Sequence, residues 1–123
     1  MYVSGFVVAV PEGSKDAYRE TAEKFWPIAR DHGALSQVEA WEADVRDGKN
    51  TDFRRAVKCE PGEKVVFSWI IWPDKAAADR FETEMESDPR MADFGEMPFD
   101  GSRMVFGGFE TIVERYAEGH APG

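Results

Sequence analysis

Two side chains of this sequence could act as a general base, His32 and Glu39. Histidine exchanges protons near neutral pH, and His32 falls at the C-terminal end of the apolar stripe of a predicted helix. Glu39 shares one face of a predicted strand with Gln37 and Trp41. If that face lines an interior, the aromatic wall raises the pKa of the carboxylate toward the range that proton transfer needs. Structural roles stay open for both residues, because a charged histidine also stabilises a helix C-terminus and Glu39 could lie on an exposed edge.

Four further residues are candidates for binding a small molecule. Arg54 and Arg55 stand out in an acidic chain, and the planar arginine fork could guide an anionic ligand toward a site. Trp41 and Trp69 add large flat apolar surfaces of the kind that line small-molecule pockets. The alternatives are ion pairs with the abundant Asp and Glu residues for the arginines, and packing in the core or in a subunit interface for the tryptophans.

The sequence has few residues for metal or redox chemistry. Cys59 is the single cysteine, so no internal disulfide can form, which fits a reducing cytoplasm. His32 is the only histidine inside the predicted fold, since His120 lies in the tail, and zinc sites usually need three or four protein ligands. We therefore predict no metal and no cofactor, with haem binding through His32 as the alternative. Gly107-Gly108 predicts a bulge or a close backbone approach, because no helix follows it to form a phosphate loop.

Bulk composition excludes several classes of partner. The formal net charge is −9, which repels phosphate backbones and anionic lipid surfaces, so we expect neither nucleic acid nor a membrane as a partner. No apolar run approaches the roughly 20 residues that cross a bilayer, and the N-terminus has no signal-peptide pattern. With 123 residues, of which 42 % are hydrophobic, the chain is predicted to be one cytoplasmic domain.

The elements that must position the candidate residues begin with a strand over 2–10 and a helix over about 15–32. Apolar residues recur at helical spacing through the second range. Ser14 is expected to cap this helix and Gly33 to end it. Pro27 lies inside the pattern and removes one backbone donor, so we expect a kink there.

The rest of the chain predicts two more strands, a second helix and a last strand. These elements span 35–43, 65–72, 74–86 and 103–115. The segment from Phe53 to Lys58 fits either one helical turn capped by Asp52 or a short strand. The order β-α-β-β-α-β predicts an α+β, ferredoxin-like protomer with one antiparallel sheet and two helices on one face. We predict a single domain over 1–116 and a flexible C-terminal tail over 117–123.

The predicted sheet is apolar on both faces, which indicates a homodimer. The strand over 65–72 carries Phe67 and Trp69 on one side and Val66 and Ile70 on the other. A face left to solvent should alternate with polar residues, and helices can cover only one of the two. The simplest cover for the second face is another copy of the chain, related by a two-fold axis.

Three blocks of the sequence carry a family resemblance over nearly the whole chain. They are Met97-Pro98-Phe99-Asp100-Gly101 with Arg103-Met104 and Gly107-Gly108-Phe109; Thr51-Asp52-Phe53-Arg54-Arg55-Ala56-Val57 with Val65-Val66-Phe67-Ser68-Trp69; and Tyr2 to Phe6 with His32-Gly33-Ala34, Glu39 and Trp41. Together they resemble the DUF1428, or YbaA-like, family. The resemblance implies a dimeric α+β barrel, and it implies no established reaction, substrate or catalytic residue.

Two functions follow as hypotheses. The first is a small, largely apolar or aromatic ligand bound between sheet and helix in each protomer, with catalysis of an isomerase-like or cofactor-independent monooxygenase-like kind left open. In that case His32 or Glu39 is the base, and Trp41 and Trp69 shape the pocket. The second is a non-catalytic structural or regulatory homodimer with a filled interior. A cavity of roughly 300 Å³ or more favours the first.

Overall fold

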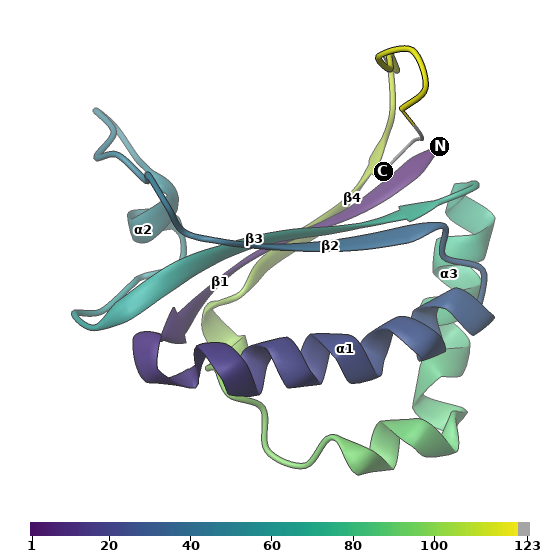
Figure 1. Cartoon of the computed structure of the whole chain (residues 1–123), viewed down its shortest axis with the longest axis horizontal. Helices are drawn as coiled ribbons and strands as arrows, with labels where there is room; N and C mark the ends of the chain where they lie inside the picture. The colour runs from purple at the N-terminus through teal and green to yellow at the C-terminus, as the bar shows by residue number, and fades with distance from the viewer. Residues whose placement is uncertain (121–123) are drawn as a thin grey trace.

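Four strands form one antiparallel sheet in the computed structural model, which describes residues 1–120 (Figure 1). The strands are β1 (Tyr2–Pro11), β2 (Ser36–Trp41), β3 (Glu63–Trp72) and β4 (Val105–Glu110), in the spatial order β2-β3-β1-β4. The helices are α1 (Lys15–Asp31), the single turn α2 (Phe53–Ala56) and α3 (Lys75–Glu84). α1 and α3 lie on the same face of the sheet. This order and layering confirm the predicted ferredoxin-like α+β fold.

The two long helices start and stop close to their predicted limits. α3 begins after Asp74, whose carboxylate accepts a hydrogen bond from the Ala77 backbone N–H at 2.8 Å. α1 continues through Pro27 and is followed by Gly33, whose φ of +108° lies in the left-handed region. The expectation that the Ser14 side chain caps α1 is wrong. A 3₁₀ turn over Glu12–Ser14 leads directly into α1, so Ser14 lacks the extended backbone that a capping side chain needs.

The structure decides one open alternative, at residues 53–56, and corrects the expected length of one strand, β4. Residues 53–56 form a helical turn, because the Asp52 carboxylate accepts from the Arg55 backbone N–H. β4 is shorter than the predicted 103–115. A 3₁₀ turn over Gly101–Arg103 precedes it, and its pairing with β1 ends where Glu110 lies opposite Tyr2, the first residue of β1.

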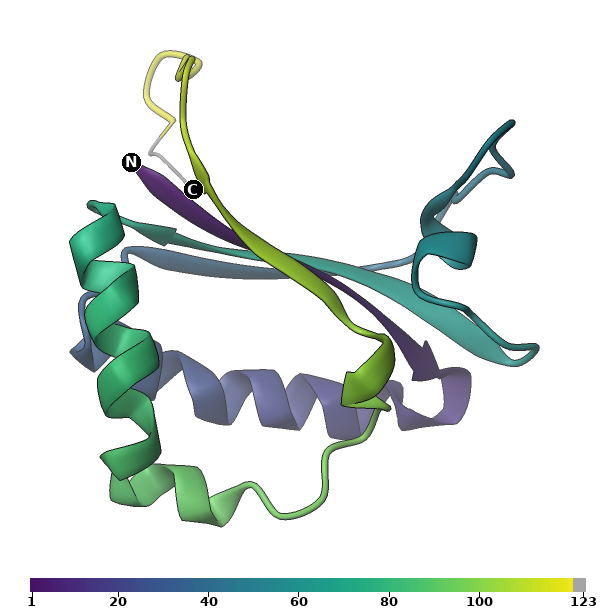
Figure 2. The ribbon, with the colours of Figure 1, turned by 180° about the vertical axis from the view of Figure 1, so that it is seen from behind.

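The two faces of the sheet have different surroundings. Side chains of even number in β1 and β3 point toward α1 and α3, and Val8, Val66 and Trp72 among them are almost fully buried. Odd-numbered side chains point to the other face, which only the short helix α2 covers, at one end of the sheet (Figure 2). There Ala9 and Val65 are buried against Val57, the residue that ends α2. Phe67 and Phe109 on this face are 45 % and 61 % exposed. The prediction that both faces are apolar is therefore confirmed.

The paired glycines of β4 allow a close approach without a bulge. Gly107 lies opposite Gly5 and Gly108 opposite Ser4, in unbroken register with β1. A Cβ atom on Gly108 would lie 1.6 Å from the Tyr2 hydroxyl oxygen. Glycine is required at position 108 because the Tyr2 ring lies against the backbone there.

The segment after β4 leaves the sheet on the side of the open face (Figure 1). Ile112 and Val113 are 95 % and 71 % exposed. The residues of the predicted tail that the structure describes, 117–120, are exposed as well. The rest of that predicted tail, 121–123, lies outside the described residues.

Candidate cleft between α1 and β2

A cleft of about 600 Å³ lies between α1 and the edge strand β2. Helix α1 contributes one side chain for each step of three or four residues, and β2 contributes alternate residues from the face that points toward the helices. The lining residues are Lys15, Tyr18, Arg19, Ala22, Glu23 and Trp26 of α1, Leu35, Ser36, Gln37, Glu39 and Trp41 at β2, and Val66 of β3. Its volume lies within the range of small-molecule sites, about 300–1,000 Å³.

The polar centre of this cleft is a hydrogen bond between its two walls. The Tyr18 hydroxyl of α1 donates to the Glu39 carboxylate of β2. Gln37 and the buried Ser68 also hydrogen-bond to this carboxylate. The sequence analysis singled out Glu39 as a candidate base, whereas it did not single out Tyr18.

Burial shifts the proton affinity of both partners upward. Loss of water around Glu39 raises its pKa, and the hydrogen bonds from Tyr18, Gln37 and Ser68 oppose that rise. Burial and the adjacent Glu39 carboxylate raise the pKa of Tyr18 far above its ordinary value. The Glu39 side chain is exposed on the edge strand, as the alternative interpretation of the sequence expected, although its carboxylate accepts a hydrogen bond from the opposite wall of the cleft. At neutral pH Tyr18 therefore stays protonated and donates its hydrogen bond to Glu39.

The loop before β4 holds the Tyr18 ring in place. Phe99 packs edge-on against Tyr18, with ring centres 5.8 Å apart. Asp100 caps the following 3₁₀ turn by accepting from the Ser102 backbone N–H at 3.0 Å. Arg103 donates to both carboxylate oxygens of Glu63 at 2.8 Å, which ties the turn to β3. Phe99, Asp100 and Arg103, which belong to one of the blocks that carry the family resemblance, thus position one wall of the cleft.

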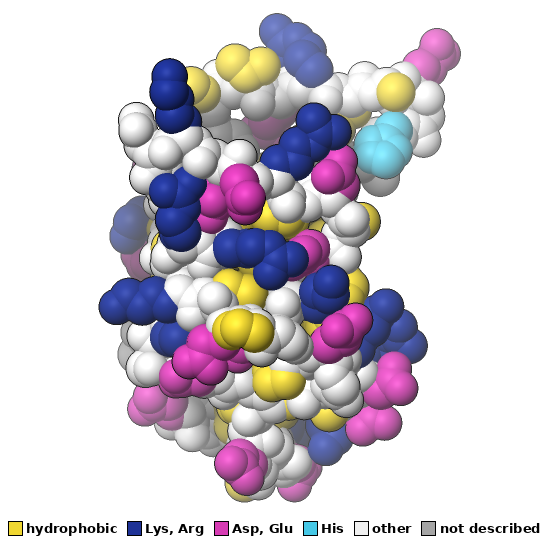
Figure 3. Space-filling model, turned by 90° about the vertical axis from the view of Figure 1, so that its left-hand side faces the viewer, with side chains coloured by type: hydrophobic (Ala, Val, Ile, Leu, Met, Phe, Trp, Pro, Cys, Tyr) yellow, Lys and Arg dark blue, Asp and Glu magenta, His cyan; other side chains and the backbone are white. Residues whose placement is uncertain are grey.

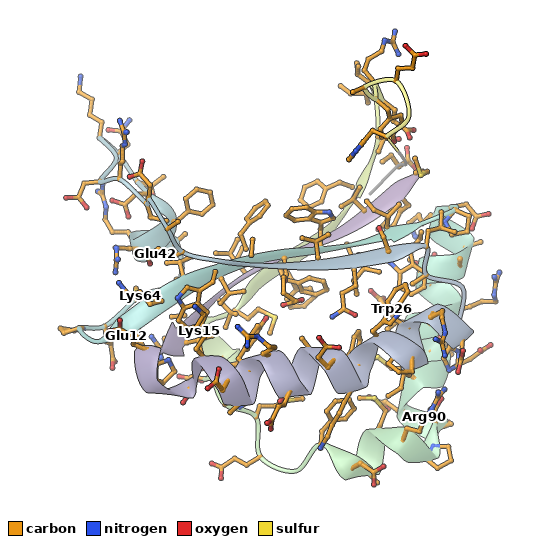
Figure 4. All side chains as sticks on the ribbon, in the orientation of Figure 1. Glu12, Lys15, Trp26, Glu42, Lys64 and Arg90 are labelled. Atoms are coloured by element: carbon orange, nitrogen blue, oxygen red, sulfur yellow. The ribbon has the colours of Figure 1, made fainter. Side chains whose placement is uncertain are left out.

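Large aromatic residues form the ends of the cleft. The Lys15 ammonium lies 5.4 Å from the centre of the Trp41 ring, a cation–π contact. Trp26 lines the other end beside Leu35. Figure 4 labels Lys15 and Trp26 near opposite ends of α1, in the space between helix and sheet. Gln37 donates to the Ala22 carbonyl at 3.2 Å, and its own buried side-chain oxygen has no hydrogen-bond partner within the described part of the chain.

The other candidate binding residues lie elsewhere. Trp69 points to the open face of the sheet, where its ring centre is 5.5 Å from that of Phe67. This open face carries a second, strongly apolar groove of about 610 Å³, lined by β1, β3 and β4. Trp41 and Trp69 are therefore on opposite faces of the sheet and cannot line one pocket within a protomer.

Arg54 and Arg55 make ion pairs around α2, away from the cleft. Arg54 pairs with Glu42 of the segment after β2, whose carboxylate also accepts from the Val65 backbone N–H at 2.9 Å. Arg55 binds the Asp52 carboxylate at 3.0 Å. Figure 3 looks onto this end of the molecule and shows Lys and Arg side chains beside Asp and Glu. The geometry is that of the ion-pairing alternative.

His32 lies just past the end of α1 and contacts two carboxylates, one at the end of α3 and one in the segment after it. Its Nε2 atom is 3.3 Å from the Asp88 carboxylate, and its Nδ1 atom is 3.5 Å from that of Glu84. Its ring packs against Phe81. Arg90 joins the same cluster by binding Asp88 at 2.7 Å. His32 is not part of the cleft lining, so the two candidate bases are not brought together.

The described residues contain no obvious metal centre or membrane span. Over 1–120, no three side chains of His, Cys, Asp or Glu come together in a way that could hold a metal ion. In the same range, none of the helices has the length and apolar character that crossing a bilayer requires.

Comparison with known proteins gives consistent matches over the chain. A family described as "Protein of unknown function (DUF1428)" matches residues 1–101. The protein YbaA of Escherichia coli strain K12 is 60 % identical over 114 residues, which cover 92 % of this chain and 97 % of that protein. YbaA of Shigella flexneri matches to the same extent.

Among solved structures, a dimeric ferredoxin-like protein from an uncultured marine organism is similar, with a TM-score of 0.55. The match covers 95 % of this chain and 100 % of that one at 7 % identity. At this identity the likeness supports the fold alone.

Proposed function

This chain belongs to the DUF1428 family, and we propose that it is a homodimer in which each protomer binds a small, largely apolar or aromatic molecule between α1 and β2. The observation that carries this proposal is the open cleft of about 600 Å³, in which one hydrogen-bonded polar pair, Tyr18 and Glu39, lies among aromatic walls. Small-molecule sites combine apolar and aromatic surface with a few polar groups that fix orientation. In this cleft Trp26 and Trp41 supply the aromatic surface, and charged residues such as Arg19 and Glu23 line it as well.

The dimer in this proposal buries the open face of the sheet. Phe67, Val105 and Phe109 remain 45 %, 47 % and 61 % exposed in the single protomer, and large apolar patches of this kind mark association surfaces. A two-fold copy would cover this face with its own. The structurally similar marine protein is itself described as dimeric. In this arrangement Trp69 serves the interface rather than the ligand.

The chemistry that the cleft supports is cofactor-independent proton transfer. Glu39 would be the base, because desolvation raises its pKa and so increases its affinity for a proton. It would take a proton from a weakly acidic C–H or O–H group of the ligand. An isomerase-like reaction would then return that proton to another atom. In a monooxygenase-like reaction the ligand itself would be the reductant: its carbanion would add to dioxygen, and the resulting hydroperoxide would lose water to leave a carbonyl group. Of the two candidate bases, we assign this role to Glu39, since His32 lies outside the cleft lining.

Native mass spectrometry of the purified protein, with and without added 2-naphthol, tests the proposal. We expect a dimer that carries a discrete ligand mass or binds one 2-naphthol per protomer. Ala22→Trp places a large ring in the cleft and should abolish this binding while the dimer persists. Ala76→Trp, on the exposed surface of α3, is the matched control and should bind as the wild type does. Binding that survives Ala22→Trp would place the ligand elsewhere.

A second candidate function is favoured by the apolar groove on the open face. If the dimer is a non-catalytic structural or regulatory module, its exposed aromatic residues serve association only. In that case native mass spectrometry would show a dimer without any retained ligand, and 2-naphthol would show no saturable binding.

A further inference from the structure

The charged groups of the cleft are separated along α1 in a way that bears on its ligand. Lys15 lies beside Trp41 at one end of the cleft. Glu39 lies two residues before Trp41 in β2, on the same face of the strand. Residues two apart in a strand are about 7 Å apart along it. A cation and a carboxylate thus face the same cleft, about the length of one or two aromatic rings from each other.

Lys15 is the cation of this cleft that has no carboxylate partner. Arg19, one turn later, is within 3.8 Å of Asp16. Over residues 1–120, Lys15 makes a cation–π contact with Trp41 and no ion pair. It is also the first residue of α1, where the helix dipole disfavours a positive charge. The Trp41 ring is the one partner of the ammonium group among the described residues, so an anionic ligand group could still form an ion pair with it.

Glu39 sets a different requirement at the centre of the cleft. Its carboxylate already accepts from Tyr18, and a second anionic group beside it would be repelled. A ligand hydroxyl group would instead donate to the remaining acceptor positions of the carboxylate. The residues that flank the space between these two points are Tyr18 and Trp41, whose aromatic rings suit an apolar ring.

Building on the proposed function, we propose that the ligand is a hydroxy-substituted aromatic carboxylic acid. Its hydroxyl group donates to Glu39, its carboxylate lies against the Lys15 ammonium, and its ring occupies the apolar space between them. The carboxylate end determines orientation and places the hydroxyl group, the acidic group that remains once the carboxylic acid is ionised, at the proposed base.

Fluorescence titration with four related probes tests this assignment. The probes are 6-hydroxy-2-naphthoate, its methyl ester, 2-naphthoate and 2-naphthol. We expect the hydroxy acid to bind the wild-type protein at least tenfold more tightly than the ester or 2-naphthol. Lys15→Met should remove this preference for the acid, whereas Lys24→Met, a control on α1 outside the cleft lining, should retain it. Glu39→Gln should reduce the advantage of the hydroxy acid over 2-naphthoate.

The outcomes separate this inference from the proposed function. If the ester and 2-naphthol bind as tightly as the acid, or if Lys15→Met keeps the preference, the ligand class is wrong while a small-molecule site stands. If none of the four probes shows saturable binding, the proposed function fails as well. Melting temperature and oligomeric state of each variant confirm that it is folded.

Discussion

The Tyr18 hydroxyl donates a hydrogen bond to the Glu39 carboxylate, and this bond joins α1 to the edge strand β2 across an open cleft. The two residues are 21 positions apart in the chain. Burial raises the pKa of both, so the pair combines a firmly held donor with an acceptor of increased proton affinity. This relationship leads to a pH effect that can be measured without knowledge of the ligand.

Glu39 should make the protein less stable as pH rises through the mildly acidic range. Its pKa in the folded state is raised, so the folded protein binds more protons than the unfolded chain between the ordinary and the raised value. Stability from this group is greatest below the ordinary pKa and falls as pH increases to the folded one. Glu39→Gln should lose this slope in the free energy of unfolding, measured by urea titration between about pH 4 and 7. Glu20→Gln, on the exposed surface of α1, should keep it; an unchanged slope in Glu39→Gln would contradict the assignment.

Gly108→Ala should destabilise the protein, whereas Gly107→Ala should be close to neutral. A Cβ on Gly108 would lie 1.6 Å from the Tyr2 hydroxyl oxygen, while a Cβ on Gly107 would lie 3.5 Å from the Phe109 ring, an ordinary contact. We expect a cost of about 1–3 kcal/mol for Gly108→Ala, measured by chemical denaturation. Tyr2→Ala should itself be destabilising, but adding Gly108→Ala to it should cost little more. Equal costs with and without the Tyr2 ring would rule out the steric explanation.

Phe67→Lys should convert the proposed dimer into a monomer. Phe67 is in the aromatic row of the open face, between Phe53 and Trp69, and a lysine there would bring two charges into an apolar two-fold interface. Analytical ultracentrifugation measures the change directly. Ala76→Lys, on the helical side, should leave the dimer intact. A monomeric wild-type protein, or a dimeric Phe67→Lys variant, would show that the open face is not the interface.

His32→Ala should lower stability and leave the cleft functional. The His32 ring links the end of α1 to Asp88 and Glu84 and packs on Phe81, so its removal should cost about 1–2 kcal/mol through lost packing and hydrogen bonding. Binding of 2-naphthol should stay within about twofold of the wild-type value, since a change of that size is less than 0.5 kcal/mol. Loss of binding in a folded variant would return His32 to the candidate site.

The element order could be read from the sequence because it depends on local patterns. Strand alternation in 65–72 and helical spacing in 15–32 are properties of neighbouring residues, and Gly33 and Asp74 mark helix ends by their own chemistry. Element limits were less accurate. β4 ends at Glu110 because its partner β1 runs out at Tyr2, and no pattern within β4 contains that information.

The candidate site was only partly predictable. Glu39 and Trp41 were placed together on one strand face, and both line the cleft. Trp69 was grouped with them, although it lies on the opposite face of the sheet. Alternation divides the residues of a strand between two faces, but it does not say which face the helices cover when both are apolar. Tyr18 could have been noticed as the one hydroxyl-bearing aromatic residue on the stripe of α1.

By itself, the sequence determined the order of elements, the two apolar faces of the sheet and the pairing of Glu39 with Trp41 on one face. Each of these follows from residues adjacent in the chain or from a period of two or 3.6. Only the tertiary structure decided that α1 packs over the Glu39 face and not over the Trp69 face. That packing brings Tyr18 to Glu39 and leaves the Trp69 face open. Contacts between residues far apart in sequence depend on how whole elements pack, because the free energy of burial is shared by the entire core.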